Sequence, residues 1–120
     1  MAARSLLLVF RRAPYGRSLS RAGYDVALAA AAFEQPVSLL FMDDGVWQLM
    51  PEQRPEAIGA RSIARTLESL PLYDIDRLYV DSESLAQRAL AAGNLVEAAT
   101  PLDTAGVREL MAGHDQVLVF

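Results

Sequence analysis

Acidic side chains follow two short apolar segments, at positions where a parallel sheet would bring them to one edge. Asp43 and Asp44 come directly after residues 37–42, and Asp81 comes directly after residues 78–80. Carboxylates at the carboxyl ends of parallel strands are typical of Mg²⁺ sites in phosphoryl transfer. Aspartates in these places are also common as turn and helix-capping residues. We therefore predict no metal centre, and keep an independent metal- or anion-binding module built on these three aspartates as an alternative.

A second candidate site is the arginine-rich segment that follows the first apolar run. Arg12, Gly16 and Arg17 are candidates for binding an anion, because guanidinium groups match anions in charge and geometry. The segment lacks the glycine-rich signatures of nucleotide-binding loops, so an ordinary turn with solvated arginines is the competing interpretation. Five arginines near the N-terminus would form a basic patch: Arg4, Arg11, Arg12, Arg17 and Arg21. The net charge of −4 nevertheless argues against direct nucleic-acid binding.

Several reaction classes are excluded by residues that the chain lacks. It contains no cysteine, which excludes disulfides, thiolate metal sites and a persulfide carried by this chain. Its eleven basic residues are all arginine, which excludes Schiff-base chemistry on lysine. Ser82 or Ser84 could act as a nucleophile only with a base, and His114 lies near the end of a different helical segment. We predict no catalytic residue and no cofactor.

An apolar cluster follows the acidic pair. It consists of Val46, Trp47, Leu49 and Met50. Tryptophan and methionine are favoured anchors at protein interfaces, so these four residues are candidates for contact with a partner. The same residues would also fit a segment folded back on the core, and the sequence leaves both interpretations open.

The elements that must position these residues are of two kinds. Continuous apolar runs, typical of strands buried on both faces of a parallel sheet, occupy residues 6–10, 37–42, 78–80 and 117–120, with a shorter one at 95–98. Between them, helical spacing predicts four helices, around residues 24–31, 63–70, 85–90 and 107–111. The expected N-caps are Ser20 for the first helix, Asp81 or Ser82 for the third, and Asp103 or Thr104 for the fourth, with Gly93 and Gly113 as stops.

This alternation of strands and helices predicts an α/β fold. With 120 residues, 52% of them hydrophobic, the chain fits a single domain over residues 1–120. We expect three layers, with a mostly parallel five-stranded sheet between helices on both faces. An antiparallel α+β arrangement would call for hairpin dipeptides such as Asn-Gly, and the sequence has none. The apolar run at residues 6–10 is too short for a signal peptide, and the longest stretch that resembles a membrane span, around residues 26–33, is too short and mostly alanine. We therefore expect a cytoplasmic protein without a membrane partner.

Five segments, in order and with compatible spacing, carry a family resemblance. They are residues 13–16 (APYG), 21–25 (RAGYD), 43–49 (DDGVWQL), 72–75 (LYDI) and 96–102 (VEAATPL). Together they resemble the TusC/DsrF branch of the DsrE family over nearly the whole chain. The resemblance implies a flavodoxin-like α/β subunit of the DsrE/F-like kind. It also implies a heterohexamer with TusB-like and TusD-like partners, in the sulfur relay that forms 2-thiouridine at the tRNA wobble position. A DsrF-like role in sulfur oxidation, beside DsrH-like and DsrE-like subunits, is the alternative.

The resemblance also bears on catalysis. In these complexes the sulfur-carrying cysteine lies on the TusD or DsrE subunit, and some family members have a further cysteine at the end of the third strand. By the register of Asp74-Ile75 and Ser84-Leu85, that position is Asp81 in this chain. The resemblance therefore implies a non-catalytic subunit whose link to tRNA modification is indirect.

Overall fold

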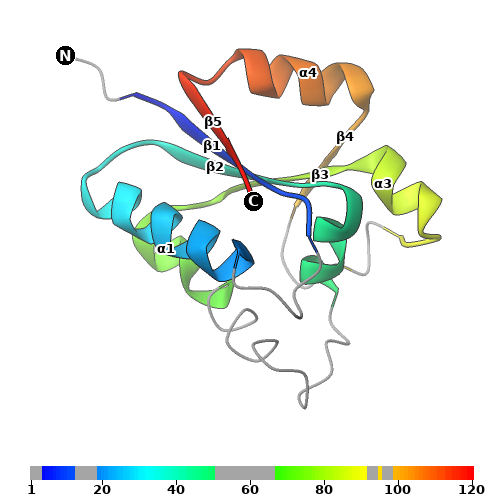
Figure 1. The fold of residues 1–120 in the computed structure, drawn as a ribbon, viewed down its shortest axis with the longest axis horizontal. Coiled ribbons are helices and arrows are strands. Elements are labelled where there is room, and N and C mark those ends of the chain that lie inside the picture. The colour runs from blue at the N-terminus through cyan, green and yellow to red at the C-terminus, as the bar shows by residue number, and fades with distance from the viewer. Residues whose placement is uncertain (1–3, 13–18, 51–66, 92–94, 96–98) are drawn as a thin grey trace.

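The apolar runs form the centre of one parallel sheet (Figure 1). The computed structural model describes residues 4–12, 19–50, 67–91, 95 and 99–120. Five strands pair in the order β4-β3-β2-β1-β5, and all four pairings are parallel, which rules out the antiparallel alternative. The strands are β1 (Leu6–Phe10), β2 (Val37–Phe41), β3 (Arg77–Asp81), β4 (Thr100–Leu102) and β5 (Gln116–Val119).

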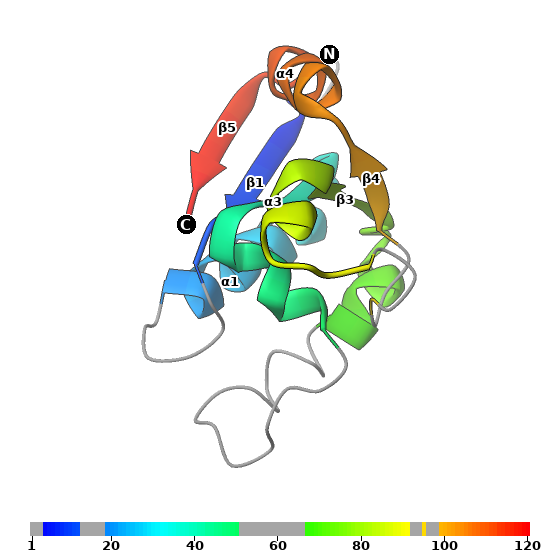
Figure 2. The same ribbon diagram turned by 90° about the vertical axis from the view of Figure 1, so that its right-hand side faces the viewer.

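Helices cover both faces of this sheet, as expected for three layers (Figures 1 and 2). On one side, α1 (Leu19–Ala32) buries Tyr24 and Ala27 against the residues of β1 and β2 that face it. On the other side, α4 (Thr104–Ala112) buries Val107 against Leu7 and Val9. Every residue of β1 and β2 is buried, because the two central strands are enclosed on both faces.

Shorter helices follow β2 and precede and follow β3. Residues 43–49 form the 3₁₀ helix η1 (Asp43–Leu49), and the helical residues 67–69 lead into a second one, η2 (Leu70–Tyr73). Helix α3 (Ser82–Gln87) begins directly at the end of β3, with Asp81 as the N-cap. Asp103 caps α4 and Gly113 ends it, as the sequence predicted.

Two details of the predicted elements were wrong. Ser20 does not cap α1, because that helix already begins at Leu19. The third helix ends at Gln87 rather than near Gly93, since Ala89 adopts a left-handed backbone that a helix cannot continue through.

Other predicted elements lie partly outside the described residues. These are residues 96–98 of the short strand expected at 95–98, Gly93, and the beginning of the second predicted helix. The structure has a strand shortly after this segment, β4, at Thr100–Leu102.

The aromatic ring of Phe10 is central to the core on the α1 side. It stacks on Tyr24, Phe41 and Phe120, with centroid separations of 4.7, 5.3 and 5.8 Å. These partners come from α1, from the end of β2 and from the end of β5. One side chain therefore ties together three elements that are distant in sequence.

Close backbone contact fixes η1 beneath the end of β1. The Met42 amide donates a hydrogen bond to the Phe10 carbonyl at 3.0 Å, and the chain turns there so that Gly45 lies against the same carbonyl. A Cβ atom on Gly45 would come within 1.8 Å of the Phe10 oxygen. Only glycine permits this approach, so the sequence Asp-Asp-Gly sets where η1 packs.

Candidate functional site

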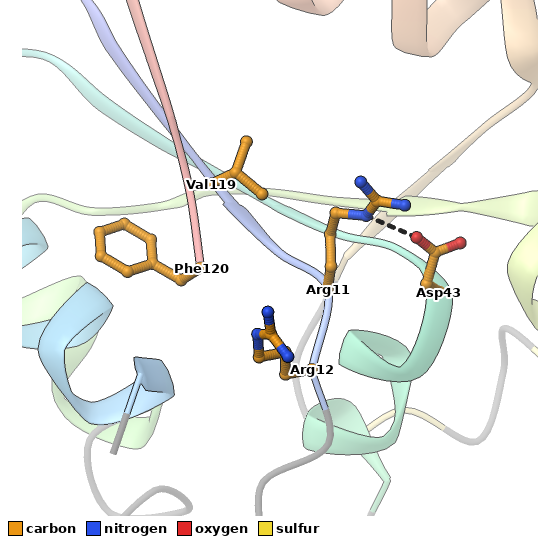
Figure 3. A pocket seen from close by; sticks show the side chains of 5 residues that line it. All are labelled: Arg11, Arg12, Asp43, Val119 and Phe120. Atoms are coloured by element: carbon orange, nitrogen blue, oxygen red, sulfur yellow. Dashed lines mark hydrogen bonds and ion pairs between the residues drawn. The ribbon is translucent and has the colours of Figure 1, made fainter. Parts of the chain in front are cut away.

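The carboxyl ends of three strands enclose a small cavity (Figure 3). It measures about 300 Å³, and its lining residues are Arg11, Arg12, Asp43, Val119 and Phe120. These residues follow β1, follow β2 and end β5, so the sheet topology brings them together. In α/β proteins, ligands usually bind at the carboxyl ends of the parallel strands.

Electrostatics inside the cavity are partly balanced. Arg11 Nε donates to Asp43 Oδ2 at 2.6 Å, and both side chains are substantially exposed. Of the predicted anion-binding residues, Arg12 lines this cavity, whereas Gly16 and Arg17 lie outside the described residues. The sequence interpretation missed the pairing of Arg11 with Asp43, although both residues directly follow strands that turned out to be neighbours.

A buried chain of hydrogen bonds joins the end of β2 to the end of β3. The Asp43 backbone N–H donates to Ser84 Oγ at 2.8 Å, and Ser84 Oγ donates to Asp81 Oδ2 at 2.6 Å. The Ser84 backbone N–H also donates to Asp81 Oδ2, at 3.3 Å, which is the N-cap bond of α3. Ser84 is 1% exposed and Asp81 is 8% exposed. The carboxylate at the predicted cysteine position is therefore committed to positioning α3 and η1.

The three aspartates considered for metal binding have separate partners. Asp43 pairs with Arg11, Asp44 pairs with Arg88 at 3.0 Å, and Asp81 bonds to Ser84. Across the described ranges, no three acidic or histidine side chains group closely enough to hold a metal ion. The geometry thus gives the alternative of a metal-binding module no common site.

Removing the Asp81 carboxylate tests how much this chain of bonds stabilises the fold. Asp81→Ala is expected to lower the free energy of unfolding by about 2 kcal/mol, because it removes a helix cap and leaves the buried Ser84 hydroxyl without its acceptor. Asp103→Ala removes a comparable cap on α4 that is exposed, and should cost about 1 kcal/mol. Urea unfolding of both variants measures the difference, and equal losses would contradict the role given to Ser84.

A second buried polar contact anchors the segment after β1. Tyr24 Oη donates to Gln48 Oε1 at 2.5 Å, and Gln48 Nε2 donates to the Arg12 carbonyl at 2.9 Å. Gln48 is fully buried. Burial raises the pKa of the Tyr24 phenol far above its ordinary value, since the phenolate would lose its hydration. This contact holds the backbone at Arg12, and so holds one wall of the cavity.

The raised pKa of Tyr24 predicts a loss of stability in alkali. Below about pH 10 both the folded and the unfolded state keep the phenolic proton, so this group adds no pH dependence. Above that pH only the unfolded chain releases the proton, and the free energy of unfolding should fall by about 1.4 kcal/mol per pH unit. Tyr24→Phe should remove this component, whereas Tyr73→Phe, at a half-exposed tyrosine, should keep it. Parallel stability curves for wild type and Tyr24→Phe, measured by urea unfolding from pH 7 to 11, would contradict the assignment.

The apolar cluster after β2 divides between core and surface. Val46 and Leu49 are fully buried, so the structure places these two predicted interface residues in the core. They pack in the cluster that contains Phe10 and Phe41. Trp47 is 39% exposed and Met50 is half-buried, which leaves these two as the candidates for partner contact from η1.

The remaining candidate residues lie at the amino ends of the strands, at the opposite end of the sheet from the cavity. His114 Nδ1 contacts the Leu110 carbonyl at 2.7 Å after α4, at the amino end of β5, and so is remote from Ser84. Asp115, also there, accepts hydrogen bonds from the Ser5 backbone and hydroxyl, which lower its pKa with a smaller contribution from Arg4. Arg4 is thus separated from Arg11 by the length of β1, about 17 Å. Arg4 therefore does not share a patch with Arg11 and Arg12, and Arg17 lies outside the described residues.

Comparison with known proteins identifies the family to which this chain with a parallel α/β fold belongs. The chain belongs to the DsrE/DsrF-like family, whose model matches residues 4–120. Over 114 residues it is 40% identical to the Protein TusC homolog of Pseudomonas aeruginosa, covering 95% of this chain and 96% of that protein, which supports the TusC/DsrF branch. The crystal structure of the ychN protein from E. coli shares the fold, with a TM-score of 0.81, 21% identity, and coverage of 98% of this chain and 99% of that one.

The described helices are too short or too polar to cross a bilayer.

Proposed function

We propose that this chain is a TusC/DsrF-like subunit of a sulfur-relay complex, in which it supports persulfide transfer by a TusD-like or DsrE-like partner without carrying sulfur itself. One observation carries the proposal: a chain 40% identical to a TusC homolog contains no cysteine. Sulfur carriage by a protein requires a thiolate that can be converted to a persulfide and attacked by the next acceptor. The thiol must therefore belong to a neighbouring subunit.

The surroundings of Asp81 support this assignment. A sulfur-carrying side chain has to reach its acceptor, whereas the Asp81 carboxylate is 8% exposed and accepts two hydrogen bonds from Ser84. The position that holds cysteine in some relatives thus has a structural role here. We infer that the contribution of the chain is the surface it presents to its partners.

The process we propose is formation of 2-thiouridine at the tRNA wobble position in the cytoplasm. The partners are TusB-like and TusD-like subunits in a heterohexamer, and the negative net charge fits a subunit that leaves tRNA contact to others. Trp47 in η1 and Met50 directly after it are the residues proposed to contact a partner, because aromatic and methionine side chains anchor interfaces.

Co-expression with the TusB-like and TusD-like proteins tests the assembly. We expect the three chains to elute together on gel filtration, and ³⁵S-labelled sulfur to attach to the TusD-like chain and never to this one. Trp47→Glu should weaken co-elution, while Phe33→Glu, at a phenylalanine that is 86% exposed on another element, serves as the matched control. Label bound covalently to this chain, or its elution apart from both partners, would overturn the proposal.

Deletion of the gene in its own organism tests the pathway. We expect loss of 2-thiouridine from the affected tRNAs, measured by mass spectrometry of tRNA digests, and restoration by the wild-type gene. Normal 2-thiouridine with impaired oxidation of sulfur compounds would instead assign the chain to a DsrF-like role.

A further inference from the structure

The two edge strands of the sheet are very different. At one edge, β4 is three residues long and contains Pro101, which has no N–H to offer another strand. At the other edge, β5 contains no proline and no charged residue, and no other described strand pairs with its outer side (Figure 2). Proteins usually protect edge strands against pairing. Unlike β4, β5 has no proline to oppose pairing, so its outer side is available to another strand.

The free edge of β5 is both polar along its backbone and apolar in its side chains. The amides of Gln116 and Phe120 donate to the Ser5 and Val9 carbonyls of the β1 segment. Because backbone groups alternate along a strand, Val117 and Val119 direct their N–H and C=O groups outward. The apolar side chains of β5 are exposed on both faces: Val117 by 36%, Leu118 by 42% and Val119 by 58%.

We propose that β5 pairs antiparallel with β5 of a second copy of this chain, around a two-fold axis at Leu118. In that register Val117 lies opposite Val119 of the second copy, and the outward groups of these residues form the paired hydrogen bonds of an antiparallel ladder. The Leu118 side chains of the two copies lie next to each other at the axis. The register satisfies every outward N–H and C=O group of Val117 and Val119.

The charged residues at the two ends of β5 also favour pairing with a second copy of this chain. Asp115 precedes β5, whereas Arg11 follows β1 beside the other end of β5, where its backbone N–H donates to the Phe120 carbonyl at 2.8 Å. A two-fold axis places Asp115 of each copy at the carboxyl end of β5 of the other copy, where Arg12 and the Arg11–Asp43 pair lie beside Val119 and Phe120. The contact is self-complementary, as isologous interfaces must be.

The contact is small, so we expect a weak dimer of the isolated chain. A four-residue edge covers less than the roughly 1,200–2,000 Å² of a stable interface, which points to dissociation in the micromolar range. Salt should weaken it by screening the Asp115–arginine pairs. The pairing does not depend on the proposed sulfur-relay function and is tested without partner subunits.

Charged residues introduced at Leu118, on the proposed two-fold axis, test whether the dimer forms. Sedimentation equilibrium of the wild-type chain should show a monomer–dimer equilibrium. Leu118→Glu and Leu118→Lys should each weaken it at least about tenfold, because like charges then meet across the axis. An equimolar mixture of the two variants should associate again. Leu72→Glu, at a leucine that is 84% exposed on η2, is the matched control and should dimerise as wild type does.

Hydrogen exchange adds a second readout in the same samples. The amides of Val117 and Val119 should become protected as concentration rises, and circular dichroism should confirm that each variant is folded. A strictly monomeric wild-type chain, or Leu118 variants that associate unchanged, would overturn the proposal. Protection of these amides only when a TusB-like or TusD-like chain is added would also overturn it and assign the edge to that partner, while leaving the proposed function in place.

Discussion

Replacing Gly45 with valine is expected to lower the free energy of unfolding by about 3 kcal/mol or more, a large share of the stability of a domain of this size. The first carbon of the new side chain would lie 1.8 Å from the Phe10 oxygen and 2.5 Å from the Phe10 carbonyl carbon. These are backbone atoms of a central strand that cannot rotate away, so η1 must move. The movement would break the hydrogen bond from Met42 to Phe10 and expose Val46 and Leu49.

Thermal and urea unfolding, with gel filtration to detect aggregation, measure the effect of Gly45→Val. Gly113→Ala is the control, since its added carbon would lie 3.3 Å from the Glu109 oxygen, and a shift of a few tenths of an ångström relieves that contact. We expect the control to stay within about 1 kcal/mol of wild type. Similar stabilities for the two variants would show that η1 does not depend on close approach to β1.

Truncation of Phe10 to alanine should cost about 3–5 kcal/mol, as for other buried aromatic residues. The ring is fully buried and stacks on three other rings, from α1, β2 and the residue after β5. Its loss leaves a cavity that the enclosed sheet cannot fill by collapsing, because β1 is paired on both sides.

Phe33→Ala provides the matched comparison for Phe10→Ala. The same atoms are removed at a residue that is 86% exposed at the end of α1, so the free energy of unfolding should change by no more than about 0.5 kcal/mol. Both values come from urea unfolding under the same conditions. A loss at Phe10 close to the loss at Phe33 would mean that the aromatic stack is not central to the core.

The parts of the fold that could be predicted are those where burial leaves a recognisable pattern of apolar residues in the sequence. The segment that became β1 is an unbroken apolar run, and the one that became β2 is interrupted only by Ser38, because both faces of these strands are covered. Strand type and parallel pairing could therefore be predicted. Strand β4 was not predicted at its observed position, since three residues including Pro101 show neither an apolar run nor alternation. The early end of α3 depends on the left-handed backbone of Ala89, which residue type does not indicate.

The candidate site was less predictable than the fold. The fates of Val46 and Leu49 were left open because η1 is a single short 3₁₀ segment, too short for its apolar residues to show a periodic face. The pairing of Arg11 with Asp43 depends on which strands are neighbours, and the order of strands in the sheet is not written in any local pattern. By contrast, Asp81 was predicted as a cap because an acidic residue between a strand and a helical segment has a local physical reason to be there.

Pro101 also limits how far a sheet built from this chain can grow. If further copies could pair with both edge strands, successive molecules would extend the sheet into a fibre, which is the usual risk of unprotected edge strands. A two-fold contact between the β5 strands leaves β4, which is short and contains Pro101, as the free edge strand at each end of the combined sheet. In the dimer proposed above, assembly would end at two molecules, because the remaining edge strand of each molecule is β4 with its proline.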